Sequence, residues 1–288
     1  MSSADLTAVR VPAWRDWLQL ARISNTPTVV SNTVAGAALV AASPDAGTVA
    51  VVAIAMALFY TAGMVLNDVM DLEIDQRDRP ERPLPSGRIS PGTALFAAVG
   101  LFVAGEALLV VQGWEPAVVG LALIALIVLY DAWHKGNVIS PVLMGGCRAL
   151  VYLVAGFAVG DSLPWELWVG AGMLLLYIVG LTQVAKAEAT GRSSVWPTAA
   201  VLAPVVFWAF LLPPVGFIVL ALFAGWVLWA LHLVRSKRIG PAVGAMIAGV
   251  SLFDAVAVAS ADGSAVALAV CLAAFAVTIA LQTKIAGT

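Results

Sequence analysis

Runs of about 16 to 20 mostly apolar residues fill this chain, and short breaks rich in Gly, Pro, Ser and Asp separate them. A run of that length makes a helix long enough to cross the hydrocarbon core of a bilayer. The composition agrees, because 61% of the 288 residues are hydrophobic and 11% are charged, whereas a soluble domain is about a quarter charged. The sequence therefore predicts an all-α, polytopic transmembrane helical bundle with nine to ten spans.

The turn residues divide the chain into ten expected spans. Because the breaks are short, consecutive spans should form antiparallel hairpins. We expect residues 1–25 to be a cytoplasmic or interfacial segment without a cleavable signal peptide, and residues 26–288 to be a single transmembrane domain. The expected spans lie near 26–43, 48–67, 92–112, 117–132, 141–160, 166–185, 196–212, 215–234, 241–260 and 264–282.

The basic residues give these spans a direction. With the N-terminus inside, fourteen of the 15 Lys and Arg residues fall in inside segments, and Arg148 lies within a span. Positive charge of this kind marks the cytoplasmic side of a membrane protein. We therefore expect a bacterial-type inner membrane protein whose chemistry lies in the cytoplasmic loops 68–91, 131–140 and 186–195. The inside residues are Arg10, Arg15, Arg22, Arg77, Arg79, Arg82, Arg88, Lys135, Lys186, Arg192, Arg235, Lys237, Arg238 and Lys284.

The densest acidic segment directly follows the second span. Asn67, Asp71 and Asp75 are spaced four residues apart, so a continuing helix would place them on one face. Asp68 would lie on a neighbouring stripe. Such oxygens repel one another unless a cation neutralises them, and Mg²⁺ is the hard ion that prefers oxygen ligands shared with phosphates. The alternative is a solvated acidic loop without a ligand.

These motifs resemble those of a known family. The segment from Asn67 to Asp75, followed by the Arg-Pro-Leu-Pro-Ser-Gly-like segment 82–87, is similar to the first signature of the UbiA superfamily of intramembrane prenyltransferases. Arg22 and Asn25 resemble that family's Arg-x-x-Asn entry. Tyr130 and Lys135 resemble its Tyr-x-x-x-Lys/Arg stretch.

The resemblance implies a Mg²⁺-dependent transfer of a prenyl group from a polyprenyl diphosphate to an aromatic or lipid acceptor in the membrane. Metal would be held by Asn67, Asp68, Asp71 and Asp75, of which Asp71 and Asp75 are also catalytic candidates together with Lys135 and Lys186. Metal and basic groups would stabilise the leaving diphosphate. The substrate-binding candidates are Arg22, Asn25, Arg82, Arg88, Tyr130, Arg148 and Glu188.

The chain departs from the family at one place. Ala185 and Ala189 stand where members of the family carry a second acidic pair, which leaves Glu188 and Lys186 nearby. This segment, together with Arg148 and its flanking residues, resembles a divergent branch, the EboC proteins. A membrane terpene cyclase, or a non-catalytic isoprenoid-binding or transport protein, is therefore the alternative function. No nucleic-acid signal is present.

Other polar residues inside the expected spans receive structural interpretations. Asp254 and Glu106 lie toward the outer halves of their spans, where structural pairing or outward snorkelling is favoured over catalysis. His134 is expected at the surface or interface rather than as a base. Cys147 and Cys271 lie in apolar runs, and we expect them to be unpaired core residues.

Overall fold

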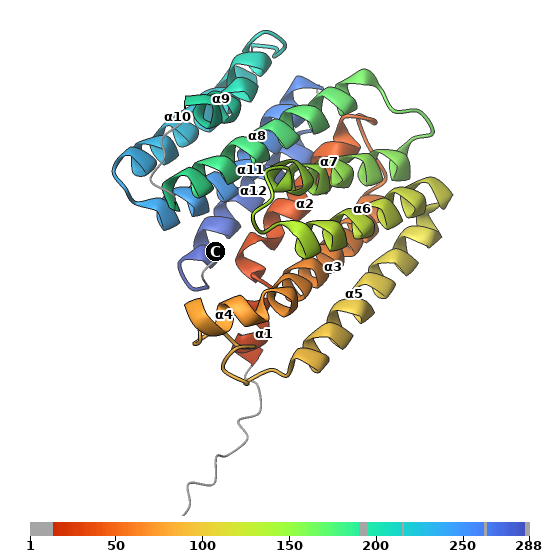
Figure 1. The fold of residues 1–288 in the computed structure, drawn as a ribbon. Helices are drawn as coiled ribbons and strands as arrows, with labels where there is room; N and C mark the ends of the chain where they lie inside the picture. The colour runs from red at the N-terminus through yellow and green to blue at the C-terminus, as the bar shows by residue number, and fades with distance from the viewer. Residues whose placement is uncertain (1–13, 190–194, 215, 262–263, 286–288) are drawn as a thin grey trace, which may run out of the picture.

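The structure is a computed structural model that describes residues 14–189, 195–214, 216–261 and 264–285. The side chains of residues 185, 187–189 and 195 fall outside this description. Within these ranges all regular secondary structure is helical (Figure 1). The helices are α1 (Trp14–Leu20), the 3₁₀ turn η1 (Ile23–Asn25), α2 (Thr26–Ala38), α3 (Ala46–Met70), α4 (Leu72–Asp78), α5 (Pro91–Gln112), α6 (Trp114–Trp133), α7 (Ser140–Val159), α8 (Trp165–Ala189), α9 (Val195–Ala209), α10 (Gly216–Arg235), α11 (Ile239–Ser260) and α12 (Ala265–Gln282).

Eight helices of the described part of the chain are long and apolar enough to cross a membrane. They are α3, α5, α6, α7, α8, α10, α11 and α12, and each coincides with one of the expected spans. The chain is therefore an all-helical integral membrane protein.

Two expected spans form shorter helices. Residues 26–43 give α2, which has 13 residues, and residues 196–212 give α9, which has 15 residues and contains Pro204. At 1.5 Å per residue these helices are about 20 Å long, below the ~30 Å hydrocarbon thickness. The expected number of nine to ten spans is reached only if one or both of these short helices are counted.

The short helix α2 lies at the centre of the bundle (Figure 1). It packs against α3, α7, α11 and α12, so it joins the first and second halves of the chain. At Gly36 a Cβ atom would stand 2.7 Å from the carbonyl oxygen of Tyr152 on α7. Only glycine permits this approach, because small residues let helix backbones come together in membrane bundles.

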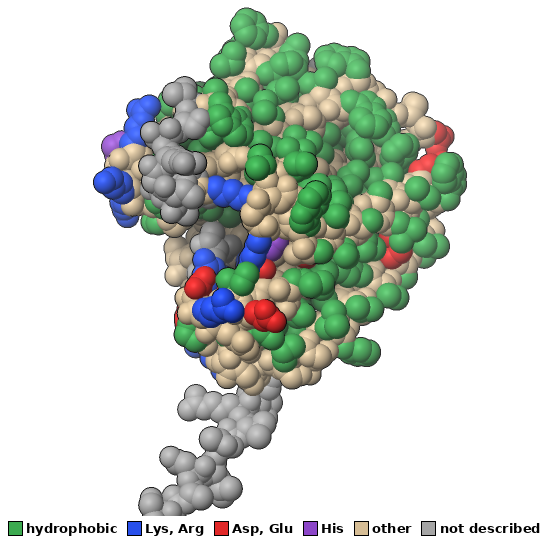
Figure 2. All heavy atoms as spheres, in the orientation of Figure 1, with side chains coloured by type: hydrophobic (Ala, Val, Ile, Leu, Met, Phe, Trp, Pro, Cys, Tyr) green, Lys and Arg blue, Asp and Glu red, His purple; other side chains and the backbone are tan. Residues whose placement is uncertain are grey.

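The outer surface matches a lipid environment. Large apolar side chains are exposed along the helices, with Phe96 82% exposed and Val111 80% exposed, and green atoms cover most of the visible face in Figure 2. Exposed tryptophans stand near helix ends, which is the usual position of an aromatic belt. These include Trp114, Trp133, Trp165, Trp168 and Trp196.

The polar side chains are distributed unevenly over the two ends of the bundle. Figure 2 shows the visible Lys and Arg side chains gathered at the end that carries α1, α4 and the turn between α10 and α11. The residues that make the candidate site lie at this same end of the bundle.

Candidate functional site

The acidic segment lies at the corner between α3 and α4. Helix α3 ends at Met70, Asp71 has a non-helical backbone, and α4 begins at Leu72. The hydrogen bonds Asp71 N to Asn67 O and Asp75 N to Asp71 O, both 2.9 Å, nevertheless bridge the break. The four-residue hydrogen-bond pattern that links Asn67, Asp71 and Asp75 therefore continues where the chain turns.

Arginines hold two of the carboxylates. The Arg82 guanidinium lies 2.8 Å from Asp75 Oδ2 and 3.5 Å from Asp68 Oδ1, so it joins the two acids. Arg22 donates a hydrogen bond to the same Asp68 oxygen at 2.9 Å. Asp68 and Asp75 are both buried, and charge-assisted hydrogen bonds of this kind are stronger than neutral ones.

Arg22 reaches Asp68 from an unusual backbone conformation. It precedes η1 in the left-handed region, with φ 44° and ψ 48°. This region costs a non-glycine residue roughly 1–2 kcal/mol, and such outliers cluster at functional sites. The strain orients a guanidinium that links the N-terminal segment to α3.

The third carboxylate pairs with the loop after α6. Lys135 Nζ lies 2.7 Å from Asp71 Oδ1, and His134 Nε2 lies 3.5 Å from Asp71 Oδ2. The hydrogen bond to Asp71 raises the pKa of His134 above its usual value. Although burial opposes it, the hydrogen bonds from His134 and Lys135 lower the pKa of Asp71. The His134 ring also stacks on Tyr130 with centroids 5.0 Å apart.

A cavity of about 510 Å³ runs from this corner into the bundle. Its size is typical of a pocket for a small organic ligand. Basic and aromatic side chains line its polar part, and aliphatic and aromatic side chains line the remainder. The polar lining includes Arg22, Asn25, Arg79, Arg82, Tyr130, Asp131 and Arg148, and the apolar lining includes Val29, Met56, Phe59, Leu123, Val151, Ile178 and Val250.

Arg148 lies on the cavity wall farther along α7. Its Nη1 donates a hydrogen bond to Asn32 Oδ1 at 2.9 Å, and its guanidinium stands over the Tyr60 ring at 5.6 Å. Asn32 in turn donates to both oxygens of Asp254 at 2.9 Å. A charge inside a membrane bundle needs such partners, and the side-chain amide of Asn32 links Arg148 to the acidic Asp254.

The acidic corner has suitable ligands for a divalent metal. In the part of the chain that the structure describes, the ion pairs of Asp68 and of Asp75 each use one carboxylate oxygen. The second oxygens, with the side-chain oxygen of Asn67, form a hard donor set that suits Mg²⁺. No three His, Cys, Asp or Glu side chains among the described residues already form a metal-binding group. Substrate oxygens and water would complete the shell, as Mg²⁺ usually requires.

Two of the described candidates, Arg88 and Lys186, belong neither to the acidic corner nor to the residues that line the cavity. Arg88 pairs with Asp16 at 2.8 Å and donates to the Glu81 carbonyl oxygen at 2.9 Å, so it ties α1 to the loop after α4. Lys186 donates to Ser140 Oγ at 2.5 Å, and it is not among the lining residues. The side chains of Glu188, Ala185 and Ala189 lie outside the described residues, as do Arg10 and Arg192.

The structure adds residues that the sequence interpretation missed. His134, expected at the surface or interface rather than as a base, touches Asp71, and its position four residues after Tyr130 is the spacing that could have identified this contact. Asp131 was given no role, yet it is 4% exposed, lines the cavity and accepts a hydrogen bond from Asn67 Nδ2 at 3.1 Å. A carboxylate at the inner end of an apolar run was the available signal.

Two structural interpretations agree with the contacts. Asp254 accepts hydrogen bonds from Ser31, Asn32 and Tyr152, and all four residues are fully buried. Cys147 and Cys271 are both free, as expected, but only Cys271 is a buried core residue, whereas Cys147 is half-buried and lines the cavity.

Comparison with known proteins identifies relatives of this fold and sequence. A profile of the UbiA prenyltransferase family matches residues 29–238. A digeranylgeranylglyceryl phosphate synthase of Methanopyrus kandleri is 31% identical over 174 residues, which are 59% of this chain and 61% of that protein. The enzyme of the same name from Sulfolobus acidocaldarius is 34% identical over 111 residues, 38% of this chain and 40% of that protein. The matched segments thus span less than two thirds of these relatives.

Solved structures share the fold at lower identity. A UbiA homologue from Aeropyrum pernix without ligand has a TM-score of 0.69 at 17% identity, covering 80% of this chain and 96% of that chain. A UbiA homologue from Archaeoglobus fulgidus bound to GPP and Mg²⁺ has a TM-score of 0.63 at 14% identity, covering 88% and 99%.

Proposed function

This chain belongs to the UbiA prenyltransferase family, and from this premise we propose that it transfers a prenyl group from a polyprenyl diphosphate to an acceptor within the membrane, with Mg²⁺. The observation that carries the proposal is the cavity that joins basic side chains, beside the acidic corner, to an apolar interior. A prenyl diphosphate has the same two parts. Each methylene buried in the apolar part contributes about 0.8 kcal/mol to its binding.

The basic residues of the polar end would bind the diphosphate. Arg22 and Arg82 each face the cavity while they contact Asp68 or Asp75. When the substrate enters, the guanidinium groups can turn their remaining N–H donors to phosphate oxygens, because a guanidinium presents five donors in a planar fork. Lys135, held by Asp71, supplies a further positive charge at the same corner.

Mg²⁺ would be held by Asn67, Asp68, Asp71 and Asp75, and it would supply positive charge to the leaving diphosphate. As the allylic C–O bond breaks, its electron pair leaves with the diphosphate, and the arginines stabilise the developing negative charge. Phe59, Tyr60 and Tyr130 line the space in which the allylic cation would form, and the apolar walls exclude water from it. The acceptor then forms the new bond to the prenyl carbon and loses a proton.

The names of the relatives suggest the class of acceptor. The curated relatives named above are digeranylgeranylglyceryl phosphate synthases, which favours a glyceryl phosphate lipid over an aromatic ring. We place the acidic corner on the cytoplasmic side of a bacterial-type inner membrane, because the Lys and Arg residues gather there. Residues 1–25 would then be cytoplasmic or interfacial.

The test uses the purified full chain in lipid nanodiscs with radiolabelled prenyl diphosphates of several lengths, with and without Mg²⁺. We expect metal-dependent diphosphate release and a prenylated lipid product when a glyceryl phosphate lipid is supplied. Release with a cyclised hydrocarbon and no acceptor would assign a terpene cyclase. Binding without any release, for every length and acceptor, would contradict the enzyme and favour an isoprenoid-binding protein.

A further inference from the structure

Asp131 has an unusual position for a carboxylate. It lies in the last turn of α6, is only 4% exposed, and lines the cavity. Its Oδ1 accepts a hydrogen bond from Asn67 Nδ2 at 3.1 Å. Its Oδ2 is buried and has no hydrogen-bond partner among the described residues. One acceptor oxygen of the cavity wall therefore lacks a hydrogen-bond partner.

The charges around Asp131 do not compensate for this in the described structure. Arg22 and His134 attract the charged carboxylate of Asp131 from a distance, whereas Asp71 repels it. No described Lys, Arg or His side chain lies within ion-pair distance of Asp131. An ionised carboxylate that is buried without a partner is costly, and proteins normally pair such a charge or use it to bind a metal.

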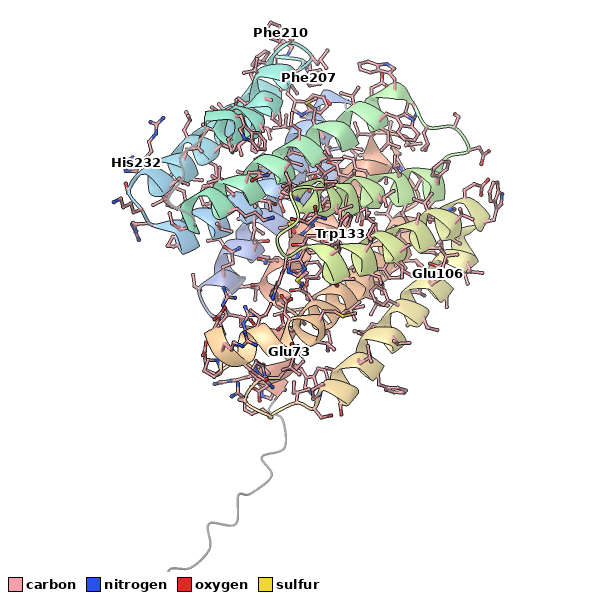
Figure 3. All side chains as sticks on the ribbon, viewed as in Figure 1. Glu73, Glu106, Trp133, Phe207, Phe210 and His232 are labelled. Atoms are coloured by element: carbon pink, nitrogen blue, oxygen red, sulfur yellow. The ribbon has the colours of Figure 1, made fainter. Side chains whose placement is uncertain are left out.

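Two other acids within the bundle, the buried Asp254 and the half-buried Glu106, show that this feature is specific to the cavity. Asp254 has both oxygens hydrogen-bonded. Glu106 on α5 also has an unpartnered buried oxygen, Oε2, but it does not line the cavity, and Figure 3 shows it apart from Glu73 of α4. Among these acids, Asp131 alone combines a spare oxygen with contact to a metal-ligand candidate.

We infer that Asp131 is a metal ligand, which binds the divalent cation together with Asn67 and joins α6 to the acidic corner of α3 and α4. This inference rests on the proposed function. It gives the site a carboxylate from a further helix, α6, although Ala185 and Ala189 replace the second acidic pair that the family resemblance implies. A hard oxygen opposite Asn67 suits Mg²⁺ and its substitute Mn²⁺.

The first test measures Mn²⁺ binding by electron paramagnetic resonance, on the full chain in nanodiscs with inorganic diphosphate present. Asp131→Asn keeps the volume and an acceptor for Asn67 Nδ2 but removes the charge. We expect its Mn²⁺ affinity to fall at least about tenfold, since even partners of metal ligands contribute that much. Glu106→Gln, which removes a half-buried acid that also has an unpartnered oxygen but lies outside the cavity, should bind Mn²⁺ as the wild type does.

A second variant separates direct ligation from a positioning effect on Asn67. Thiolate is a soft ligand, so Asp131→Cys should bind Cd²⁺ at least about tenfold more tightly relative to Mn²⁺ than the wild type. Glu106→Cys is the control for a new thiol within a helix outside the cavity, and Cys147 and Cys271 are present in every variant. A residue that only orients Asn67 would not shift the preference between metals.

The outcomes distinguish this inference from the proposed function. If Asp71→Asn loses Mn²⁺ affinity while Asp131→Asn and Asp131→Cys behave as the wild type, Asp131 is no ligand and the proposed function stands. If the wild type binds no Mn²⁺ even with diphosphate present, both are overturned.

Discussion

The bundle contains two polar clusters, and they differ in how their acids are partnered. In the deep cluster, neutral donors from Ser31, Asn32 and Tyr152 satisfy Asp254, and all are fully buried. In the corner cluster, Asp68, Asp71 and Asp75 pair with cationic side chains, and two of these, Arg22 and Arg82, line the cavity. The first arrangement is closed to ligands, whereas the second can exchange partners. Burial of an acid is thus a poor guide to function unless its partners are known.

The largest effect is expected from opening the deep cluster. Asp254→Ala should lower the free energy of unfolding by about 3–5 kcal/mol, because it leaves three donors without an acceptor and Arg148 without a nearby acid. Thermal unfolding in detergent, followed by intrinsic fluorescence, measures the change. Thr278→Val, which removes a buried hydroxyl bonded within its own helix at 2.8 Å, is the control. Equal melting temperatures for the two variants would show that the deep cluster is not structural.

In the corner cluster, a substitution should reduce turnover rather than stability. Asp71→Ala should reduce prenyl diphosphate turnover about 10²–10³-fold, the usual cost of removing one electrostatic contact to a developing charge, with little change in melting temperature. The assay is diphosphate release at saturating Mg²⁺. Glu73→Ala removes an exposed acid two residues away and should retain full turnover. Loss of turnover in both variants would indicate a nonspecific charge effect.

Arg82 tests whether the corner's cations bind the diphosphate. Arg82→Ala should weaken binding of a non-ionising prenyl thiodiphosphate about 10- to 100-fold, because a charge-assisted hydrogen bond contributes roughly 1.5–3 kcal/mol. Competition against a radiolabelled prenyl diphosphate gives the dissociation constant. Unchanged affinity would mean that Arg82 serves only to neutralise Asp68 and Asp75.

Arg88 should give the smallest effect. Its partner is Asp16, and its side chain is 32% exposed, so the pair should contribute less than about 1 kcal/mol to stability. Arg88→Ala should therefore retain the wild-type affinity for the thiodiphosphate in the same competition assay. A loss as large as that of Arg82→Ala would restore the phosphate-binding role expected from the sequence.

The sequence predicted the spans well because hydrophobic length is a local property. The eight long helices fall where the apolar runs lie, whereas α2 and α9 are shorter than their runs. In α2 the reason is tertiary. It is surrounded by other helices, so its apolar residues face protein rather than a full thickness of lipid.

The site was predicted where spacing along one helix decides it. Asn67, Asp71 and Asp75 needed only the four-residue repeat, which the backbone preserves across the break at Asp71. The contacts of Arg88 and Asp131 depend on how the loop after α4 and the end of α6 approach other elements. Spacing carries no information about such approaches, so the Arg88–Asp16 and Asp131–Asn67 contacts became visible only in the structure.

The most direct test is a structure of the full chain with Mn²⁺ and a prenyl thiodiphosphate, with Mn²⁺ located by its anomalous scattering. The account predicts an anomalous peak within ligand distance of Asp71 and Asp75, a diphosphate against Arg22 and Arg82, and a prenyl chain in the apolar part of the cavity. A bound prenyl chain with its diphosphate elsewhere, or no Mn²⁺ peak at the α3–α4 corner, would contradict it.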